Sequence, residues 1–283
     1  MSKTLQRLLI FFIGIPLVVF IVCLNFANHI AMQLLAFAAT VIGTIEMHNI
    51  LGKKLDTQPL PLVIILTLII PVATYFYVLF VLSYNVVILV TLLSAFVSLA
   101  VEIFAYDRET LSFEKALQRI ASTLFILFYC GYLVSFITRM SKWEHCSAYT
   151  ATFLVMVFGC DSIAWFFGML LGKGNRGVFK VSPNKSIMGF IGGVAGSCAA
   201  TVICCLAFSA ISLDQLPKMM FIAACVSITA IAGDLIESVF KRSADVKDSG
   251  NVIPGRGGIL DCLDSVLISA PLYYLLVTLF FGM

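Results

Sequence analysis

Long apolar stretches alternate with short polar connections along the chain. A transmembrane helix needs about 20 predominantly apolar residues, and nine stretches come close to that length or exceed it. They cover residues 8–26, 30–51, 60–82, 85–105, 117–138, 148–171, 187–211, 217–240 and 264–282. The pattern therefore predicts an all-α integral membrane protein of about nine transmembrane helices. No connection is long enough for a soluble domain, so we expect a single polytopic membrane domain over 1–283.

Lysine and arginine fall mainly into every second connection. If the stretches cross a membrane in turn, 15 of the 18 basic residues lie on the side of the N-terminus. The opposite side receives Arg139, Lys142 and Lys218. Because basic connections stay on the cytoplasmic side, we expect a multi-pass protein of the cell (inner) membrane. Its N-terminus would be cytoplasmic and its C-terminus outside.

The composition agrees with a membrane protein. Hydrophobic residues make up 61% of the chain and charged residues 12%, whereas soluble domains contain about 25% charged residues. A net charge of +3 is too small to indicate nucleic acid as a partner. The first stretch is longer than a signal-peptide core and ends without a small-residue cleavage site, so we expect it to be retained. The nine cysteines include no C-x-x-C pair, which favours packing as small apolar side chains.

Segment 233–265 differs from the other connections because it concentrates acidic residues. Ionisable groups near a membrane are costly and usually functional. Six of the 15 acidic residues lie there, namely Asp234, Glu237, Asp245, Asp248, Asp261 and Asp264. One helical face carries the i, i+3, i+4, i+7 series Asp234, Glu237, Ser238 and Lys241. We expect this face at the cytoplasmic end of the eighth helix.

Asp261 and Asp264 are also spaced i, i+3, at the expected start of the last helix. Together with Asp234 they could converge on one or two Mg²⁺ ions, because hard cations prefer carboxylate and phosphate oxygens. The alternative is that Asp261 and Asp264 only stabilise the positive N-terminus of that helix.

Two connections rich in glycine and basic residues suit a phosphate ligand. In the first, Gly255, Gly257 and Gly258 surround Arg256 just before a helix, and backbone N–H groups in such loops bind anions. The second, 172–189, contains four basic residues. It either binds a substrate phosphate or anchors the chain to anionic lipid heads.

Carboxylates also lie inside the apolar stretches outside this acidic segment, and Asp161 and Glu46 are two of them. Asp161, followed by Ser162, lies within the sixth stretch and needs a partner or a polar cavity there. Glu46 lies near the inner end of the second stretch. Its side chain either reaches the interface or lines the cavity, and the sequence does not decide between the two.

The fixed positions of the acidic segment form a long pattern. It reads Ser238-x-Phe240-Lys241-Arg242-x4-Lys247-Asp248-x-Gly250-x-x-Ile253-Pro254-x-Arg256-Gly257-Gly258-Ile259-x-Asp261-Cys262-Leu263-Asp264. This pattern resembles the signature of the phosphatidate cytidylyltransferases, also called CDP-diacylglycerol synthases. The pair Asp161-Ser162 and the run Ser182-Pro183-Asn184-Lys185-Ser186 are similar to that family as well. The resemblance is strong over about 155–270 and only topological before that.

The resemblance implies transfer of the CMP group of CTP to phosphatidic acid in the lipid bilayer, with CDP-diacylglycerol and diphosphate as products. The spans within 1–140 would precede a catalytic part at 148–283, whose site faces the cytoplasm. The implied cofactor is Mg²⁺, as one or two divalent ions or with a monovalent second ion, on Asp234, Asp261 and Asp264. The implied catalytic residues are Asp234, Lys241, Lys247, Asp248 and Asp261. The implied substrate-binding residues are Asp161, Ser162, Ser182, Lys185, Ser186, Ser238, Arg242, Gly255, Arg256, Gly257 and Gly258.

The chain departs from the usual family pattern at three positions. Arg256 stands where the family usually has His, Cys262 where it usually has Arg, and Met188 where it often has Glu. Arg256 keeps a cation beside the glycines but cannot exchange a proton near neutral pH. Three alternatives stay open: an ion-coupled transporter, a catalytically inactive relative, and a different lipid nucleotidyl- or phosphotransferase. The oligomeric state is also open, a homodimer included.

Overall fold

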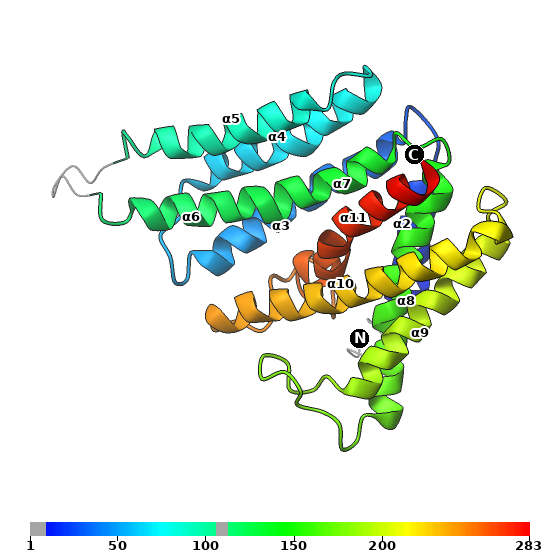
Figure 1. Ribbon diagram of the computed structural model, residues 1–283. Helices are drawn as coiled ribbons and strands as arrows, with labels where there is room; N and C mark the ends of the chain where they lie inside the picture. Colours follow the sequence, from blue (N-terminus) through cyan, green and yellow to red (C-terminus); the bar gives the residue numbers. More distant parts are fainter. Residues whose placement is uncertain (1–9, 106–112) are drawn as a thin grey trace.

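The computed structural model describes residues 10–105 and 113–283. Within these ranges the chain is helical, and β-type pairing is limited to two isolated bridges. The start of the first predicted stretch, the basic residues before it and Arg108 lie outside the described residues. The elements of Figure 1 are η1 (Ile10–Gly14), α2 (Ile15–Cys23), α3 (Ile30–Leu51), α4 (Leu60–Leu79), α5 (Asn85–Val101), α6 (Ala116–Ile126), η2 (Leu127–Tyr132), α7 (Leu133–Met140), α8 (Cys146–Leu171), α9 (Ile187–Ala207), η3 (Leu213–Gln215), α10 (Leu216–Ser243) and α11 (Leu260–Phe281).

Helices form over each of the nine predicted stretches, but their lengths differ. In the described part of the chain, seven are long and apolar enough to cross a membrane. The segments Phe12–Cys23 and Asn85–Val101 are shorter. At about 1.5 Å per residue, a 17-residue helix such as α5 spans about 25 Å, less than the roughly 30 Å of a bilayer core. The all-α class is confirmed for these residues, and the nine crossings and their orientation stay predictions.

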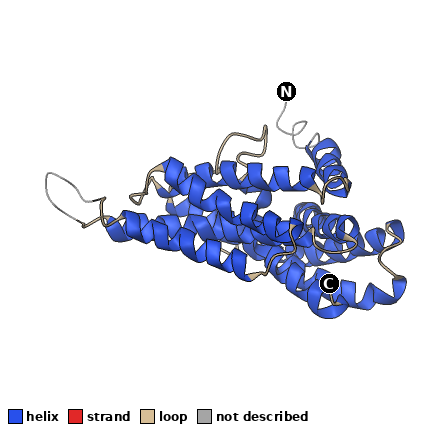
Figure 2. Ribbon diagram, turned by 90° about the horizontal axis from the view of Figure 1, so that it is seen from above, coloured by secondary structure: helices blue, strands red, loops and turns tan. Residues whose placement is uncertain are grey.

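The C-terminal helices pack as two antiparallel pairs, α8 with α9 and α10 with α11, and the first pair crosses the second steeply (Figure 1). Small residues allow the backbones of α8 and α9 to approach. A Cβ atom on Gly196 of α9 would lie 2.6 Å from the Cβ atom of Ile163 on α8. Viewed from above, the loops lie at the ends of the helices (Figure 2). The crossing brings the middle of α8 beside α10 and α11.

Buried aromatic side chains fasten α8 to α11. The rings of Phe153 and Tyr273 stack with their centroids 4.8 Å apart. The Tyr273 hydroxyl donates a hydrogen bond of 2.7 Å to the carbonyl oxygen of Tyr149. All three side chains are fully buried or nearly so. Burial of such large rings contributes strongly to packing, so the two helices have a fixed relative position.

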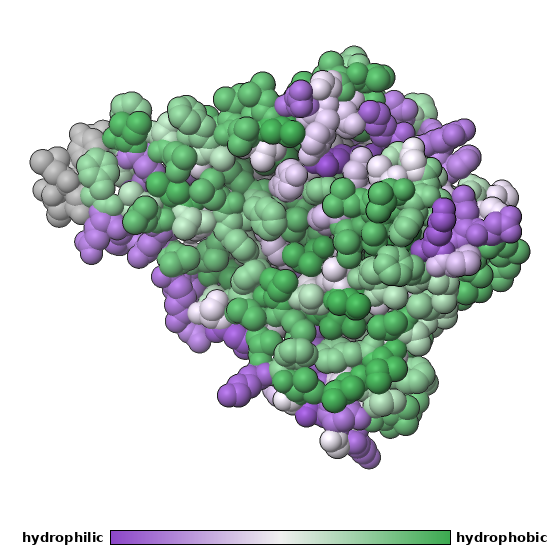
Figure 3. Space-filling model, viewed as in Figure 1, coloured by the Kyte–Doolittle hydropathy of each residue, from purple (hydrophilic) through white to green (hydrophobic). Residues whose placement is uncertain are grey.

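Polar residues gather at two opposite edges of the molecule, with a broad hydrophobic band between them (Figure 3). The loops 52–59, 172–186 and 244–259 lie toward the same edge, at the lower left of Figure 1. An ion pair of 2.5 Å between Lys54 and Asp245 joins two of these loops. The charged segments that the sequence analysis singled out therefore meet at one end of the helices.

Candidate functional site

Three charged side chains project from one face of α10 near its C-terminal end. Asp234, Glu237 and Lys241 share this face, as their i, i+3, i+7 spacing predicts. Glu237 is completely buried, and its Oε2 atom forms an ion pair of 2.5 Å with the Nζ atom of Lys241. The charged face of α10 is therefore directed into the protein.

The first turns of α11 lie beside this face. The helix begins at Leu260, before the predicted start at 264, so Asp261 and Asp264 both belong to it. Gly233 on α10 permits the close approach, because a Cβ atom there would lie 2.6 Å from the carbonyl oxygen of Asp264. Asp264 is 5% exposed. The predicted juxtaposition of carboxylates from the two helices is therefore observed.

Both carboxylate oxygens of Asp261 have partners. Its Oδ1 atom forms an ion pair of 2.5 Å with Lys241. Its Oδ2 atom accepts hydrogen bonds from the backbone N–H groups of Ser249, at 2.8 Å, and Gly258, at 2.7 Å. The Ser249 hydroxyl lies 2.8 Å from the same oxygen. Asp261 thus ties the 244–259 loop to α10, and charge-assisted hydrogen bonds of this kind are strong.

The opposite wall is formed by the loop 172–186 and the start of α9. The Nζ atom of Lys185 forms an ion pair of 2.5 Å with Asp234. Ser186 is the N-cap of α9, where its Oγ atom accepts a 3.0 Å hydrogen bond from the N–H group of Gly189. Because capping fixes the start of the helix, Ser186 also fixes the position of the neighbouring Lys185.

Two further carboxylates lie deeper, on either side of Ser265. The Ser265 hydroxyl lies 3.5 Å from Oδ1 of Asp161 on α8, and its N–H group donates a 2.6 Å hydrogen bond to Oδ1 of Asp264. Asp161 lies within one of the seven helices that are long enough to cross a membrane. A carboxylate within such a helix needs a partner or a polar cavity.

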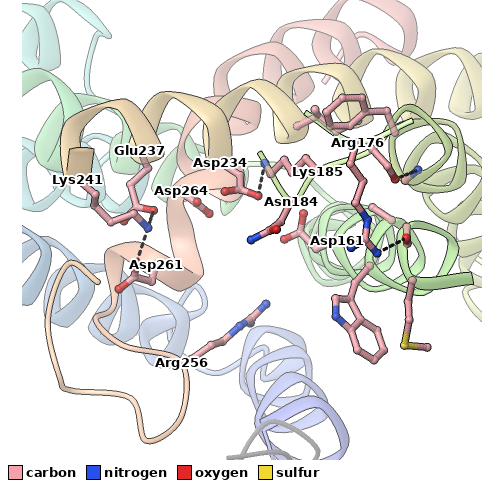
Figure 4. Close-up of a pocket in the computed structure, with 18 residues that line it drawn as sticks. Asp161, Arg176, Asn184, Lys185, Asp234, Glu237, Lys241, Arg256, Asp261 and Asp264 are labelled. Atoms are coloured by element: carbon pink, nitrogen blue, oxygen red, sulfur yellow. Dashed lines mark hydrogen bonds and ion pairs between the residues drawn. The ribbon is translucent and has the colours of Figure 1, made fainter. Parts of the chain in front are cut away.

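These elements surround a cavity of about 500 Å³ (Figure 4). The labelled side chains of Asp161, Asp234, Asp264 and Arg256 are directed into it from four segments of the chain. Its polar lining consists of Asp161, Arg176, Asn184, Lys185, Ser186, Asp234, Glu237, Lys241, Arg256, Asp261 and Asp264. Its other lining residues are Ala164, Trp165, Gly168, Met169, Gly189, Phe190 and Ile231.

The charges around the cavity fall into two groups. Lys185 and Lys241 form ion pairs with three carboxylates, those of Asp234, Glu237 and Asp261. Among the described residues, by contrast, no ion pair involves Asp161, Asp264 or Arg256. A buried charge without a partner is unfavourable, so a charged ligand would gain most from these three side chains.

The carboxylates around the cavity suit a hard divalent cation. Asp161 and Asp264 form no ion pair within the described ranges, and Mg²⁺ is usually bound by one or two carboxylates together with phosphate oxygens. In residues 10–105 and 113–283, no group of three or more His, Cys, Asp or Glu side chains is arranged around a common metal position. The Oδ2 atom of Asp234 is paired with Lys185, so a cation would bind this carboxylate through its other oxygen or displace Lys185.

The predicted site residues divide between the cavity wall and its surroundings. Those that line the cavity are Asp161, Lys185, Ser186, Asp234, Lys241, Arg256, Asp261 and Asp264. Those outside its lining are Ser162, Ser182, Ser238, Arg242, Lys247, Asp248, Gly255, Gly257 and Gly258. The Ser162 hydroxyl donates to the carbonyl oxygen of Phe158 at 2.7 Å, within its own helix. Arg242, Lys247 and Asp248 are exposed.

Four residues of this region were not among the predicted site residues. Glu237 was on the predicted polar face of α10, so its i, i+3 spacing was a sufficient signal. Arg176 and Asn184 lie in the predicted cation-rich loop and line the cavity. Glu46 contacts the 244–259 loop from α3. No local pattern could indicate that contact, because the partners are more than 200 positions apart.

The arrangement agrees with the comparison of the chain with known families. The sequence profile described as "Cytidylyltransferase family" matches residues 5–280. The chain belongs to the cytidylyltransferase family. The match covers α2 to α11 almost completely, so the resemblance in the C-terminal half extends to the N-terminal helices that the sequence analysis related to the family only by topology.

Several curated relatives carry the name phosphatidate cytidylyltransferase. The relative from Bacillus subtilis is 40% identical over 129 residues, which are 44% of this chain and 46% of the relative. The relative from Chlamydia pneumoniae is 35% identical over 175 residues, 56% of this chain and 54% of the relative. For Pseudomonas aeruginosa the values are 38% over 134 residues, 47% and 49%. The matched region thus spans about half the length of these relatives.

Proposed function

We propose that this member of the cytidylyltransferase family transfers the CMP group of CTP to phosphatidate, giving CDP-diacylglycerol and diphosphate. The observation that carries the proposal is a cavity with charged side chains of both signs at the end of apolar helices. A reaction between a nucleoside triphosphate and an anionic lipid needs such a place, because both reactants carry phosphate charge that must be neutralised.

The basic side chains of the cavity suit the phosphate groups. Arg256 is directed into the cavity (Figure 4) and has no ion-pair partner among the described residues. A guanidinium group binds phosphate through two parallel hydrogen bonds. Arg176 and Lys185 face it from the other wall. We assign the CTP phosphates to the space between Arg256 and these two residues.

The lipid chains have a suitable place next to the cavity. An apolar groove of about 400 Å³ lies between α9 and α10 and shares Phe190 and Ile231 with the cavity. Its full lining is Phe179, Phe190, Ile191, Val194, Ile228, Ile231, Ala232 and Leu235. A phosphatidate molecule could therefore place its head group in the polar cavity while its acyl chains stay in apolar surroundings.

The chemical step needs alignment more than acid or base catalysis. An oxygen of the phosphatidate phosphate attacks the α-phosphorus of CTP, the bond between the α-phosphorus and the bridging oxygen breaks, and diphosphate leaves. The lipid phosphate is already ionised at neutral pH, so the protein has to hold the two phosphates in line. Arg256 and Lys185 would do so electrostatically, without moving a proton.

Magnesium dependence is part of the proposal. When bound, Mg²⁺ would neutralise charge on the triphosphate. Asp161 and Asp264, which lack ion-pair partners in the described chain, and Asp234 are the best-placed ligands. Asp261, a ligand in the sequence-based prediction, is bonded to Lys241 and to the loop. We therefore assign Asp261 to the support of the site and Asp161 to the metal ligands.

We further propose nine crossings of the cell membrane with this cavity on the cytoplasmic side. The loops 52–59, 172–186 and 244–259, which lie toward one edge of the molecule, carry 10 of the 18 basic residues together with the adjoining ends of α10. Because basic loops are retained in the cytoplasm, this edge is the cytoplasmic one. CTP would then reach the cavity directly from the cytoplasm.

The decisive experiment uses the purified chain in lipid nanodiscs with phosphatidate and radiolabelled CTP, with and without Mg²⁺. We expect labelled CDP-diacylglycerol and an equal amount of diphosphate, only when Mg²⁺ is present. A reaction in which CTP is replaced by ATP serves as the nucleotide control. Absence of labelled lipid with well-folded protein would rule out the proposed activity for this chain.

A further inference from the structure

Glu46 is a buried carboxylate that comes from the opposite half of the chain. It lies on α3, is 4% exposed, and does not line the cavity. An isolated ionised carboxylate in such surroundings would be very unfavourable. Glu46 must therefore obtain its stabilisation from hydrogen-bond donors.

The donors all belong to the loop before α11 and to the start of that helix. The Oε1 atom of Glu46 accepts a hydrogen bond of 2.9 Å from the N–H group of Ile259. The Oε2 atom accepts one of 3.0 Å from the N–H group of Leu260 and lies 3.1 Å from the hydroxyl of Ser249. The first N–H groups of a helix have no partner within it and carry a partial positive charge. Glu46 thus acts as a capping carboxylate for α11, although it belongs to α3.

Two glycines of the loop lie close to the same carboxylate. A Cβ atom on Gly250 would lie 2.9 Å from the Cδ atom of Glu46. A Cβ atom on Gly258 would overlap with both Oε atoms of Glu46 and with the Ser249 hydroxyl. A side chain at either position would therefore displace the Glu46 carboxylate from its donors.

Ser249 connects Glu46 to the cavity. Its hydroxyl lies 3.1 Å from Oε2 of Glu46 and 2.8 Å from Oδ2 of Asp261, and the N–H group of Asp261 lies 3.3 Å from the same hydroxyl. Leu260, which Glu46 binds, directly precedes Asp261 and lies one turn before Asp264. A shift at Leu260 would therefore move the carboxylates that line the cavity.

We propose that Glu46 is a positioning residue that fixes the loop 249–259 and thereby the placement of Arg256, Asp261 and Asp264. It acts through the backbone and Ser249, without touching the substrates. The expected effect on turnover rests on the proposed cytidylyltransferase activity. The stabilisation of the loop by Glu46 does not depend on that activity.

Hydrogen–deuterium exchange without substrates tests whether Glu46 fixes the loop 249–259. In Glu46→Gln, one of the two acceptor oxygens becomes an NH₂ group that repels the N–H donors, so peptides covering 249–262 should exchange about tenfold faster or more. Exchange elsewhere should stay as in wild type. Glu46→Asp keeps both acceptors on a shorter side chain and should give an intermediate rate.

Glu102→Gln is the matched control. Glu102 is 5% exposed, forms an ion pair of 2.6 Å with Arg119, and accepts a hydrogen bond of 2.7 Å from the Nε2 group of Gln58. The Glu102→Gln substitution thus removes a similarly buried carboxylate, but one that does not contact the loop 249–259. Hydrogen–deuterium exchange over 249–262 should remain as in wild type. Ser249→Ala removes the bridging hydroxyl from the loop side and should accelerate the same peptides, which keeps the test decisive if Glu46→Gln fails to fold.

Kinetics distinguish positioning from simple stabilisation. Since misplacement of reacting groups by about 1 Å can cost 100-fold, Glu46→Gln should lower kcat on the order of 10- to 100-fold. The KM for CTP should change much less, and Glu46→Asp should restore part of kcat. Unchanged exchange and kcat in Glu46→Gln, or faster exchange spread over the whole chain, would overturn the inference. An inactive wild type would refute the proposed function and leave the exchange result to decide the role of Glu46.

Discussion

Lys241 lies at the centre of the charged network, and its removal gives a well-defined prediction. Its Nζ atom forms ion pairs of 2.5 Å with Glu237, which is fully buried, and with Asp261, whose side chain is 7% exposed. Lys241→Met leaves both carboxylates without their cation. Removal of one partner from a buried pair costs about 3–5 kcal/mol. Asp261 keeps its hydrogen bonds to Ser249 and Gly258, so we expect the lower end, about 3 kcal/mol.

Thermal unfolding in one detergent, followed by tryptophan fluorescence, measures this loss. At roughly 2–4 °C per kcal/mol, the Tm of Lys241→Met should fall by about 6–12 °C. Arg242→Met is the matched control, because Arg242 is the adjacent cation, is exposed, and reaches only the carbonyl oxygen of Val246 at 3.5 Å. Its free energy of unfolding should change by about 0.5 kcal/mol or less.

The double variant Glu237→Gln/Lys241→Met sharpens the test. It removes the buried charge that the single change leaves behind, so it should unfold at a higher temperature than Lys241→Met alone. A different result would refute the reasoning: a Tm of Lys241→Met close to that of wild type, combined with a large rise in the KM for CTP. Lys241 would then be a catalytic residue that contacts CTP, as the family resemblance implies, and not the centre of a structural network.

Four further predictions concern the cavity, the loop and the topology. Asp264→Asn should abolish turnover without lowering Tm, because it removes a buried charge that has no cation beside it in the described chain; a lower Tm would instead indicate a structural role. Arg256→Lys should keep part of kcat/KM, whereas Arg256→Ala should lose about 1.5–3 kcal/mol of transition-state stabilisation, or about 10- to 100-fold. The Lys54 ammonium lowers the pKa of Asp245, so the ion pair contributes fully at neutral pH; the Tm difference between wild type and Asp245→Asn should begin to shrink at about pH 4 and should vanish once the pH is below that lowered pKa. A reporter fused after Met283 should read outside the cytoplasm, and a cytoplasmic reading would contradict the orientation.

The helices were predictable because long apolar runs have few alternatives in a membrane. The face of α10 was predictable as well, because residues three and seven positions apart must share it. The predicted apolar stretch 264–282 is shorter than the helix that contains it, because α11 begins at Leu260. Asp261 and Asp264 both lie in the first turns of α11, as expected. Charge within the first turn is compatible with a helix, since an acidic side chain there is favourable.

Contacts between distant helices could not be predicted from spacing. The role of Glu46 depends on the packing of α3 against the start of α11, and its donors lie 203 to 214 positions further along the chain. The partners of Asp261 were hidden for a similar reason. Its position suggested a metal ligand, while its bonds to Lys241 and to the loop became visible only in three dimensions.

The charged side chains of the site differ in how much of their charge is available to a ligand. Lys241 is shared by the carboxylates of Glu237 and Asp261, and the carboxylate of Glu46 is bound by N–H groups and a hydroxyl. Buried networks of ion pairs and hydrogen bonds favour one arrangement of the backbone. Asp161, Asp264 and Arg256 form no ion pair among the described residues and face the cavity. Substitutions in the first group should therefore change stability and the geometry of the loop, whereas substitutions in the second should change affinity for the metal and the nucleotide.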